Sequence, residues 1–155
     1  MRFYSEPRLQ AIAASQDGLV TATQALSLGY SRGVIKGRRL SGRWRLMAPG
    51  VYLIDADMWG DPLPPRVWWR AALLFNGPNS CLVGSTALRL YGVHGLPLRE
   101  RRIEVGVVGG PSRHGRRPAS IPLRGRDETA LDVVVRQFAI AREEIVVESG
   151  LQVRT

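Results

Sequence analysis

The fold is decided by the stretch DGLVTATQALSLGYSRGVIKGRRLSGRWRLMAPGVYLI, residues 17–54. It opens on Asp17-Gly18, a turn signal that precedes an apolar pair typical of a short strand. Thr21 and Gln24 follow at the spacing of a capping box, in which a hydroxyl and an amide side chain satisfy free N–H groups at a helix start. The first part of the stretch therefore predicts a turn, a short strand and a short helix.

A second helix is predicted over residues 32–41. Gly29 supplies the left-handed residue of a tight turn, and Ser31 is a favourable N-cap. Gly37 opposes this helix, because glycine in mid-helix costs about 1 kcal/mol relative to alanine. We expect three apolar side chains to hold this helix against the preceding one: Val34, Ile35 and Leu40.

The next residues predict a hairpin. Strand-like runs at 43–47 and 51–54 flank a turn at Ala48-Pro49-Gly50. Two short helices followed by such a hairpin are the order of a winged helix-turn-helix. Residues 31–45 also contain six cationic residues and no acidic one, which places positive charge on the second helix and the hairpin.

This arrangement predicts sequence-directed binding to duplex DNA, with the second helix at the major groove. Trp44 is expected to anchor the hairpin to the domain, so that its neighbouring arginines face the phosphate backbone. The residues that we expect to contact DNA are Thr21, Ser31, Arg32, Lys36, Arg38, Arg39, Arg43 and Arg45.

Composition favours a nucleic-acid partner. The chain has 155 residues, a formal net charge of +9 and 45% apolar residues, which suit one medium or two small globular domains. The bias to arginine, with Lys36 the only lysine, suits bidentate contacts but is equally explained by a GC-rich coding sequence. A lone cysteine, no apolar leader and no long apolar segment predict a cytoplasmic protein without membrane contact.

The whole chain is predicted to be α+β, with a winged helix-turn-helix at 1–58 and a small mixed α/β domain at 59–155. A helix at 7–16 packs the first domain, and a Pro-rich linker at 55–65 ends it. The second half shows helices at 65–75 and, capped by Ser85, up to Tyr91, strands at 81–83, 102–108 and 119–123, an apolar run at 133–135, helical character at 138–144, and a C-terminal hairpin. A basic loop there offers an auxiliary DNA contact through Arg113, Arg116 and Arg117, although a solvated or protein-binding loop is the more common interpretation.

The sequence does not predict an enzyme, a metal site or a cofactor. Nuclease chemistry of the restriction type needs paired acidic ligands and a lysine near a strand, and Lys36 lies in the proposed recognition helix. Cys81 is better interpreted as a core thiol than as a nucleophile, because His94 and His114 lie beside glycines in loops and nothing orients them.

Several short motifs resemble the N-terminal part of bacterial AbiEi-type antitoxins, over about residues 7–110. They are QDGLVT at 16–21, AL to G at 25–29, SGRW at 41–44, PGVY at 49–52, RAALL at 70–74 with GP at 77–78, and STAL at 85–88 through YG at 91–92 with GLP at 95–97. The resemblance implies a type IV toxin-antitoxin system: a repressor that binds inverted repeats in its own promoter, with a second domain that opposes a nucleotidyltransferase-like toxin. By comparison with that family, we expect the second domain to be abbreviated in this chain.

Two alternatives stay open. The first is a DNA-binding module that is related to, or acts beside, a nuclease and has no catalytic residues of its own. The second is an interaction protein whose basic surface meets an acidic protein. The oligomeric state is not predicted.

Overall fold

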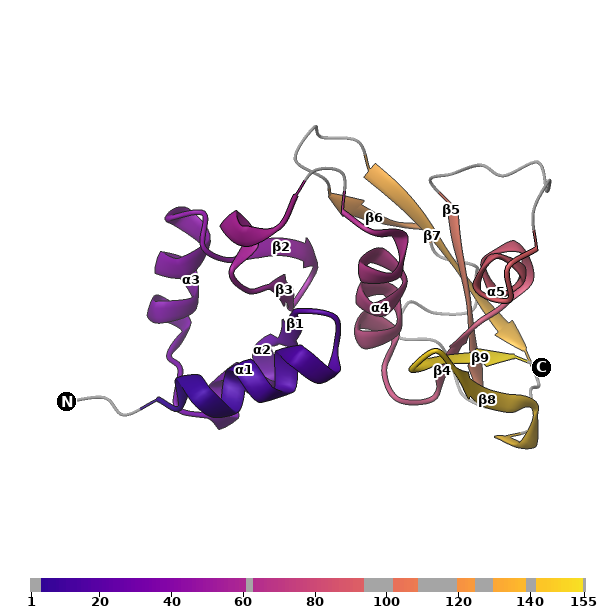
Figure 1. Ribbon diagram of the computed structural model, residues 1–155, viewed down its shortest axis with the longest axis horizontal. Coiled ribbons are helices and arrows are strands. Elements are labelled where there is room, and N and C mark those ends of the chain that lie inside the picture. Colours follow the sequence, from indigo (N-terminus) through magenta and orange to yellow (C-terminus); the bar gives the residue numbers. More distant parts are fainter. Residues whose placement is uncertain are drawn as a thin grey trace. The chain divides into compact units, whose positions relative to one another are not determined.

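The chain is a mixed α+β protein with two compact units, Met1–Ala71 and Ala72–Thr155. The computed structural model describes residues 4–60, 63–93, 102–108, 120–124, 130–138 and 142–154. Each unit combines helices with a sheet of its own (Figure 1).

The first unit follows the predicted order of elements. Its helices and strands are α1 (Glu6–Ser15), β1 (Leu19–Thr21), α2 (Ala22–Ser27), α3 (Arg32–Leu40), β2 (Arg45–Ala48) and β3 (Val51–Leu53), followed by the 3-10 turn η1 (Ala56–Met58) and the start of α4 (Pro65–Asn76). The predicted strand, capping box, turn, second helix and hairpin are therefore all confirmed as secondary structure.

The strands of this unit form an antiparallel sheet in the order β1-β3-β2. Leu19 of β1 and Arg45 of β2 both pair with Leu53 in the central strand, and β2 has an irregularity between Leu46 and Ala48. Three helices and the sheet share one apolar core, whose buried members are Leu9, Ala13, Val20, Ala25, Tyr30, Ile35, Trp44 and Ile54. The core explains why such short helices are stable, since tertiary packing of an apolar face compensates for their length.

The prediction that Leu40 packs against the preceding helix is wrong. Its side chain is 78% exposed, whereas Ile35 is 5% exposed and Val34 is half-buried. At 100° per residue, Leu40 is rotated by about 140° from Ile35, so the two side chains leave the helix on different sides. A prediction from apolar character alone therefore assigned Leu40 to the wrong side of the helix.

The first unit also extends beyond the predicted boundary at residue 58, because the start of α4 contacts it. Arg66 and Arg70 form ion pairs with Asp17, and Arg45 lies over the ring of Trp68 at 5.4 Å from the centroid. The stretch from 55 to 65 thus connects elements of one unit, and α4 runs through the division between the units.

A six-stranded mixed sheet forms the second unit, in the order β6-β7-β5-β4-β9-β8. Its elements are β4 (Ser80–Leu82), α5 (Gly84–Leu90), β5 (Arg102–Val108), β6 (Ser120–Arg124), β7 (Ala130–Phe138), the 3-10 turn η2 (Arg142–Glu144), β8 (Ile145–Glu148) and β9 (Leu151–Arg154). The pairs β4–β9 and β5–β7 are parallel, and the other neighbours are antiparallel.

Two local predictions in this unit need correction. Phe138 does not begin a helix but ends β7, where it pairs with Val108 of β5, so strand pairing overrides local helical character there, and within the described part of 138–144 helical structure occurs only in the 3-10 turn η2. Ser85 is not the N-cap of α5, since Val83 has that position. The backbone N–H of Ser85 instead donates to the Glu104 carboxylate at 3.0 Å, which satisfies the helix start from a neighbouring strand.

No helix in the described ranges is long and apolar enough to cross a membrane.

Candidate nucleic-acid interface

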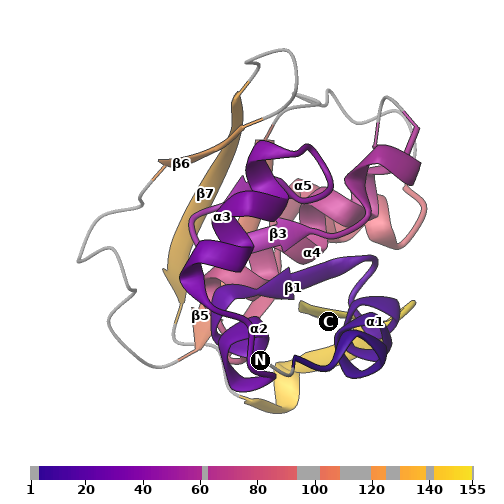
Figure 2. The same ribbon diagram turned by 90° about the vertical axis from the view of Figure 1, so that its left-hand side faces the viewer.

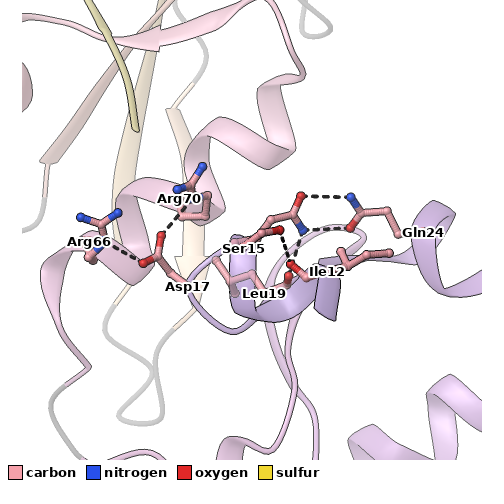
Figure 3. A network of polar contacts seen from close by, with 8 residues as sticks. Ile12, Ser15, Asp17, Leu19, Gln24, Arg66 and Arg70 are labelled. Atoms are coloured by element: carbon pink, nitrogen blue, oxygen red, sulfur yellow. Dashed lines mark hydrogen bonds and ion pairs between the residues drawn. The ribbon is translucent and has the colours of Figure 1, made fainter. Parts of the chain in front are cut away.

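The start of α2 is fixed by a network of amide and hydroxyl groups. The backbone N–H of Gln24 donates to the Thr21 hydroxyl at 3.1 Å, and the backbone N–H of Thr21 donates to the Gln24 side chain at 2.9 Å. Gln16 and Gln24 exchange two further hydrogen bonds, both at 3.0 Å, and Gln16 also donates to the carbonyl of Leu19 (Figure 3). The Thr21 side chain, predicted to contact DNA, is a structural cap here.

The turn between α2 and α3 has the predicted chemistry. Gly29 has a φ of 93°, in the left-handed region that glycine tolerates. Tyr30 follows with 2% exposure and enters the core, and the Ser31 hydroxyl accepts a hydrogen bond from the backbone N–H of Val34 at 3.2 Å. Ser31 therefore acts as the N-cap of α3 and fixes the direction in which that helix begins.

Four of the predicted cations, which we call the row, are exposed on α3 or directly after it. Arg32, Lys36 and Arg39 follow each other at intervals of four and three residues on α3, which places them on one side of the helix, and Arg43 lies in the segment after it. All four are exposed, and none of their side chains makes an ion pair or hydrogen bond to another residue that the structure describes. Figure 2 views α3 from outside the first unit, with this helix nearest the viewer.

Arg38 lies on the other side of α3 and has an internal partner. Its Nη2 donates to the Glu6 carboxylate at 2.6 Å and lies 3.4 Å from the Tyr4 hydroxyl, and its side chain is only 14% exposed. Burial lowers the pKa of Arg38, but the hydrogen bonds to Glu6 and Tyr4 outweigh this effect and leave the pKa raised. The Arg38 side chain therefore stabilises the first unit and is not exposed to a ligand as the other cations of α3 are.

A column of aromatic rings supports α3 from inside. Tyr4, Tyr30, Trp44 and Tyr52 follow one another with centroid separations of 4.5, 5.6 and 5.8 Å. Trp44 is 3% exposed, which confirms that it anchors the hairpin. Burial, together with the nearby Glu6 carboxylate, raises the pKa of Tyr30 above its ordinary value, so this ring stays neutral in the core.

The hairpin offers less to a ligand than its sequence suggests. Its turn is held against the start of α2, where the N–H of Ala22 donates to the carbonyl of Gly50 at 2.8 Å. Arg45 is half-buried and lies over Trp68. Arg43, in the connection from α3 to β2, is the exposed arginine on this side of Trp44.

Sequence reasoning missed one cluster that stabilises the first unit. Asp17, with a φ of 56°, places its two carboxylate oxygens 2.6 Å from Nε of Arg66 and 2.9 Å from Nε of Arg70 (Figure 3). Arg66 and Arg70 are four residues apart and therefore share one face of α4. That spacing was the available signal, but nothing in the sequence marked Asp17 as their partner.

Arg113, Arg116 and Arg117, which we predicted as an auxiliary DNA contact, lie outside the described residues. Within the described ranges, no group of three or more His, Cys, Asp or Glu residues is placed to hold a metal ion.

No protein-family model matches the sequence, and no curated protein matches it. Function is therefore inferred from the residues themselves.

Proposed function

We propose that this protein is a sequence-specific repressor that binds duplex DNA through a winged helix-turn-helix, with α3 as the recognition helix. The order of α1, β1, α2, α3 and the β2–β3 hairpin supports this interpretation. The observation that carries it is the row of four exposed cations, Arg32, Lys36, Arg39 and Arg43, without partners among the described residues.

The geometry of α3 suits the major groove. That groove is about 12 Å wide and admits one α-helix. Because Val34, Ile35 and the Arg38–Glu6 pair occupy the inner side of α3, its outer side is left for DNA. Lys36 lies in the middle of the helix, where it reaches base edges, while Arg32, Arg39 and Arg43 reach phosphates on the groove wall.

The proposal is tested by the salt dependence of binding to a short DNA duplex, followed by fluorescence anisotropy. The three phosphates that Arg32, Arg39 and Arg43 neutralise give a slope of log affinity against log salt of about −2.7 for each bound protomer. Replacement of Arg32, Arg39 or Arg43 by Gln is expected to weaken binding and to make the slope shallower by about 0.9 in each case, whereas Lys36→Gln is expected to weaken binding mainly by the loss of a base contact.

The matched control is Arg8→Gln. Arg8 is exposed on α1, two residues after Glu6, and therefore leaves that helix about 200° away from the residue that contacts α3. It removes one positive charge without touching the row, so a smaller change in slope is expected. A salt slope close to zero for the unmodified protein would contradict the proposal. Equal losses of DNA affinity for Arg8→Gln and Lys36→Gln would also contradict it.

We further propose that the protein is the autoregulating antitoxin of a type IV toxin-antitoxin system, on the strength of the AbiEi-like motifs on both sides of residue 59. In that case it represses its own promoter at inverted repeats, and a nucleotidyltransferase-like toxin is its partner. Co-expression with such a toxin from the neighbouring gene is expected to restore growth. Continued growth arrest despite intact DNA binding would contradict the antitoxin proposal but would not contradict the repressor proposal.

A further inference from the structure

Leu40 is the apolar side chain that α3 exposes most. It is 78% exposed, and it follows Lys36 by four residues, so the two side chains lie next to each other on the helix surface. At 100° per residue, both point away from the side on which Val34, Ile35 and Arg38 are covered. Lys36 and Leu40 therefore form the centre of the outer face of α3.

The two flanks of this centre differ. Arg32 and Arg39 lie on one side, and Gly33 and Gly37 lie on the other. A Cβ atom at Gly33 would meet no atom closer than the Ser31 Oγ at 3.8 Å, and one at Gly37 would meet nothing within 4 Å. Internal packing thus does not require these glycines, and they leave the approach to Leu40 open.

We propose that Leu40 is a specificity-determining residue that contacts the 5-methyl group of a thymine in the major groove, an inference that rests on the proposed function. The thymine methyl is the apolar group that base pairs present in that groove. The side chain of Leu40 is shorter than that of Lys36, but the thymine methyl group stands out from the base edge into the groove, and contact removes apolar surface of both partners from water.

A second copy of the chain is a poorer occupant of this face. Self-association through Leu40 would bring Lys36, Arg32 and Arg39 of two copies together, and like charges at short range repel. A duplex supplies the opposite charge on both walls of the groove and an apolar group at its floor. Charge complementarity therefore selects DNA over a dimer contact.

The experiment starts from a duplex that the unmodified protein selects from a random library. Each thymine of that duplex is then replaced, one at a time, by deoxyuridine, which lacks the methyl group. At one thymine, or one per repeat, the unmodified protein is expected to lose about fourfold in affinity, the value of one buried methyl group. The Leu40→Ala variant is expected to bind the thymine duplex and the deoxyuridine duplex with equal affinity. Its slope of log affinity against log salt is expected to equal that of the unmodified protein.

Leu26→Ala is the matched control, since it truncates a leucine of α2 that is 38% exposed and lies outside the row. It is expected to keep the preference for thymine. The contact is refuted if the unmodified protein tolerates deoxyuridine at every position, or if Leu40→Ala keeps the preference. Failure to bind any duplex would instead refute the proposed function, and a dimer dissociated by Leu40→Ala would assign the residue to self-association.

Discussion

At the scale of single residues, the turn at Asp17-Gly18 is constrained by both backbone conformation and packing. Asp17 adopts a left-handed conformation that few non-glycine residues tolerate. A Cβ at Gly18 would lie 2.7 Å from Cζ2 of Trp59, and its φ of 87° is also left-handed. The carboxylate of Asp17 then joins this turn to Arg66 and Arg70. One side chain therefore links the end of α1 to α4.

Asp17→Asn is expected to lower the free energy of unfolding by about 2 kcal/mol, the typical worth of a charge-assisted hydrogen-bond pair that is partly exposed. Asparagine tolerates the left-handed conformation, so the loss reports the ion pairs and not backbone strain. Urea denaturation of the full chain measures the effect.

The control for that change is Asp57→Asn, which makes the same substitution at an exposed position of η1. It is expected to change stability by less than about 0.5 kcal/mol. Equal effects at the two positions would mean that the Asp17 cluster does not stabilise the unit.

Neighbouring arginines show the limit of what could be predicted at this scale. Arg38 and Arg39 are adjacent and chemically identical, yet one is paired with Glu6 and the other is exposed. A rotation of 100° separates them, and the inner side of α3 is set by Ile35, three residues before Arg38. The position of Glu6 across the core, which decides the matter, depends on tertiary structure.

At the scale of elements, capping residues were the most reliable signals. Thr21 with Gln24 and Ser31 act through backbone groups within three residues, so their effects did not depend on the rest of the fold. The long strand β7 was underestimated, because its length is set by pairing with β5 along seven consecutive residues. Local chemistry predicted where α2 and α3 begin, but it misplaced the start of α5, and partner strands decided how far β7 extends.

The composition of α3 gives a stability prediction of its own. Gly37 has an ordinary helical conformation and open space around it, so Gly37→Ala is expected to stabilise the protein by about 1 kcal/mol. Gly42 also has open space but a φ of 80°, and Gly42→Ala is expected to destabilise the protein by about 1 kcal/mol. Thermal and urea unfolding of the two variants measure both changes.

The Gly37→Ala and Gly42→Ala variants separate the effect of backbone conformation on stability from the effect of packing, because neither added methyl group has an atom within 4 Å. If both variants were destabilised, the outer face of α3 would be closer to other parts of the chain than the structure shows. If Gly37→Ala stabilised the protein yet weakened DNA binding, the glycine would be retained for the approach of a ligand at the expense of stability.

At the scale of the whole molecule, charge is distributed unevenly along the sequence. Residues 31–45 contain six of the 22 cationic residues and no acidic residue, whereas three of the 13 acidic residues lie at Glu143, Glu144 and Glu148, around β8. The second unit as a whole is nevertheless basic, with 12 cationic and eight acidic residues in 72–155, compared with ten and five in 1–71. Total charge therefore does not distinguish the two units, and the feature particular to residues 31–45 is that they contain no acidic residue.

The two units offer separate reporters of unfolding. All four tryptophans, Trp44, Trp59, Trp68 and Trp69, precede Ala72, and the single thiol, Cys81, lies in β4 with no exposed surface. Burial raises the pKa of the Cys81 thiol, so the native protein is expected to be inert to a thiol reagent at neutral pH. Tryptophan fluorescence thus follows the first unit, and thiol labelling follows the second.

We expect the two signals to change at the same urea concentration. Helix α4 contributes Val67 and Ala71 to the first unit and the buried residues Ala72 and Leu73 to the second, and a continuous helix unfolds cooperatively over this length. Asp17→Asn, which weakens the hold of the first unit on α4, is then expected to lower both midpoints together. Labelling of Cys81 well below the fluorescence midpoint would show instead that the second unit opens alone, and that α4 does not transmit stability between them.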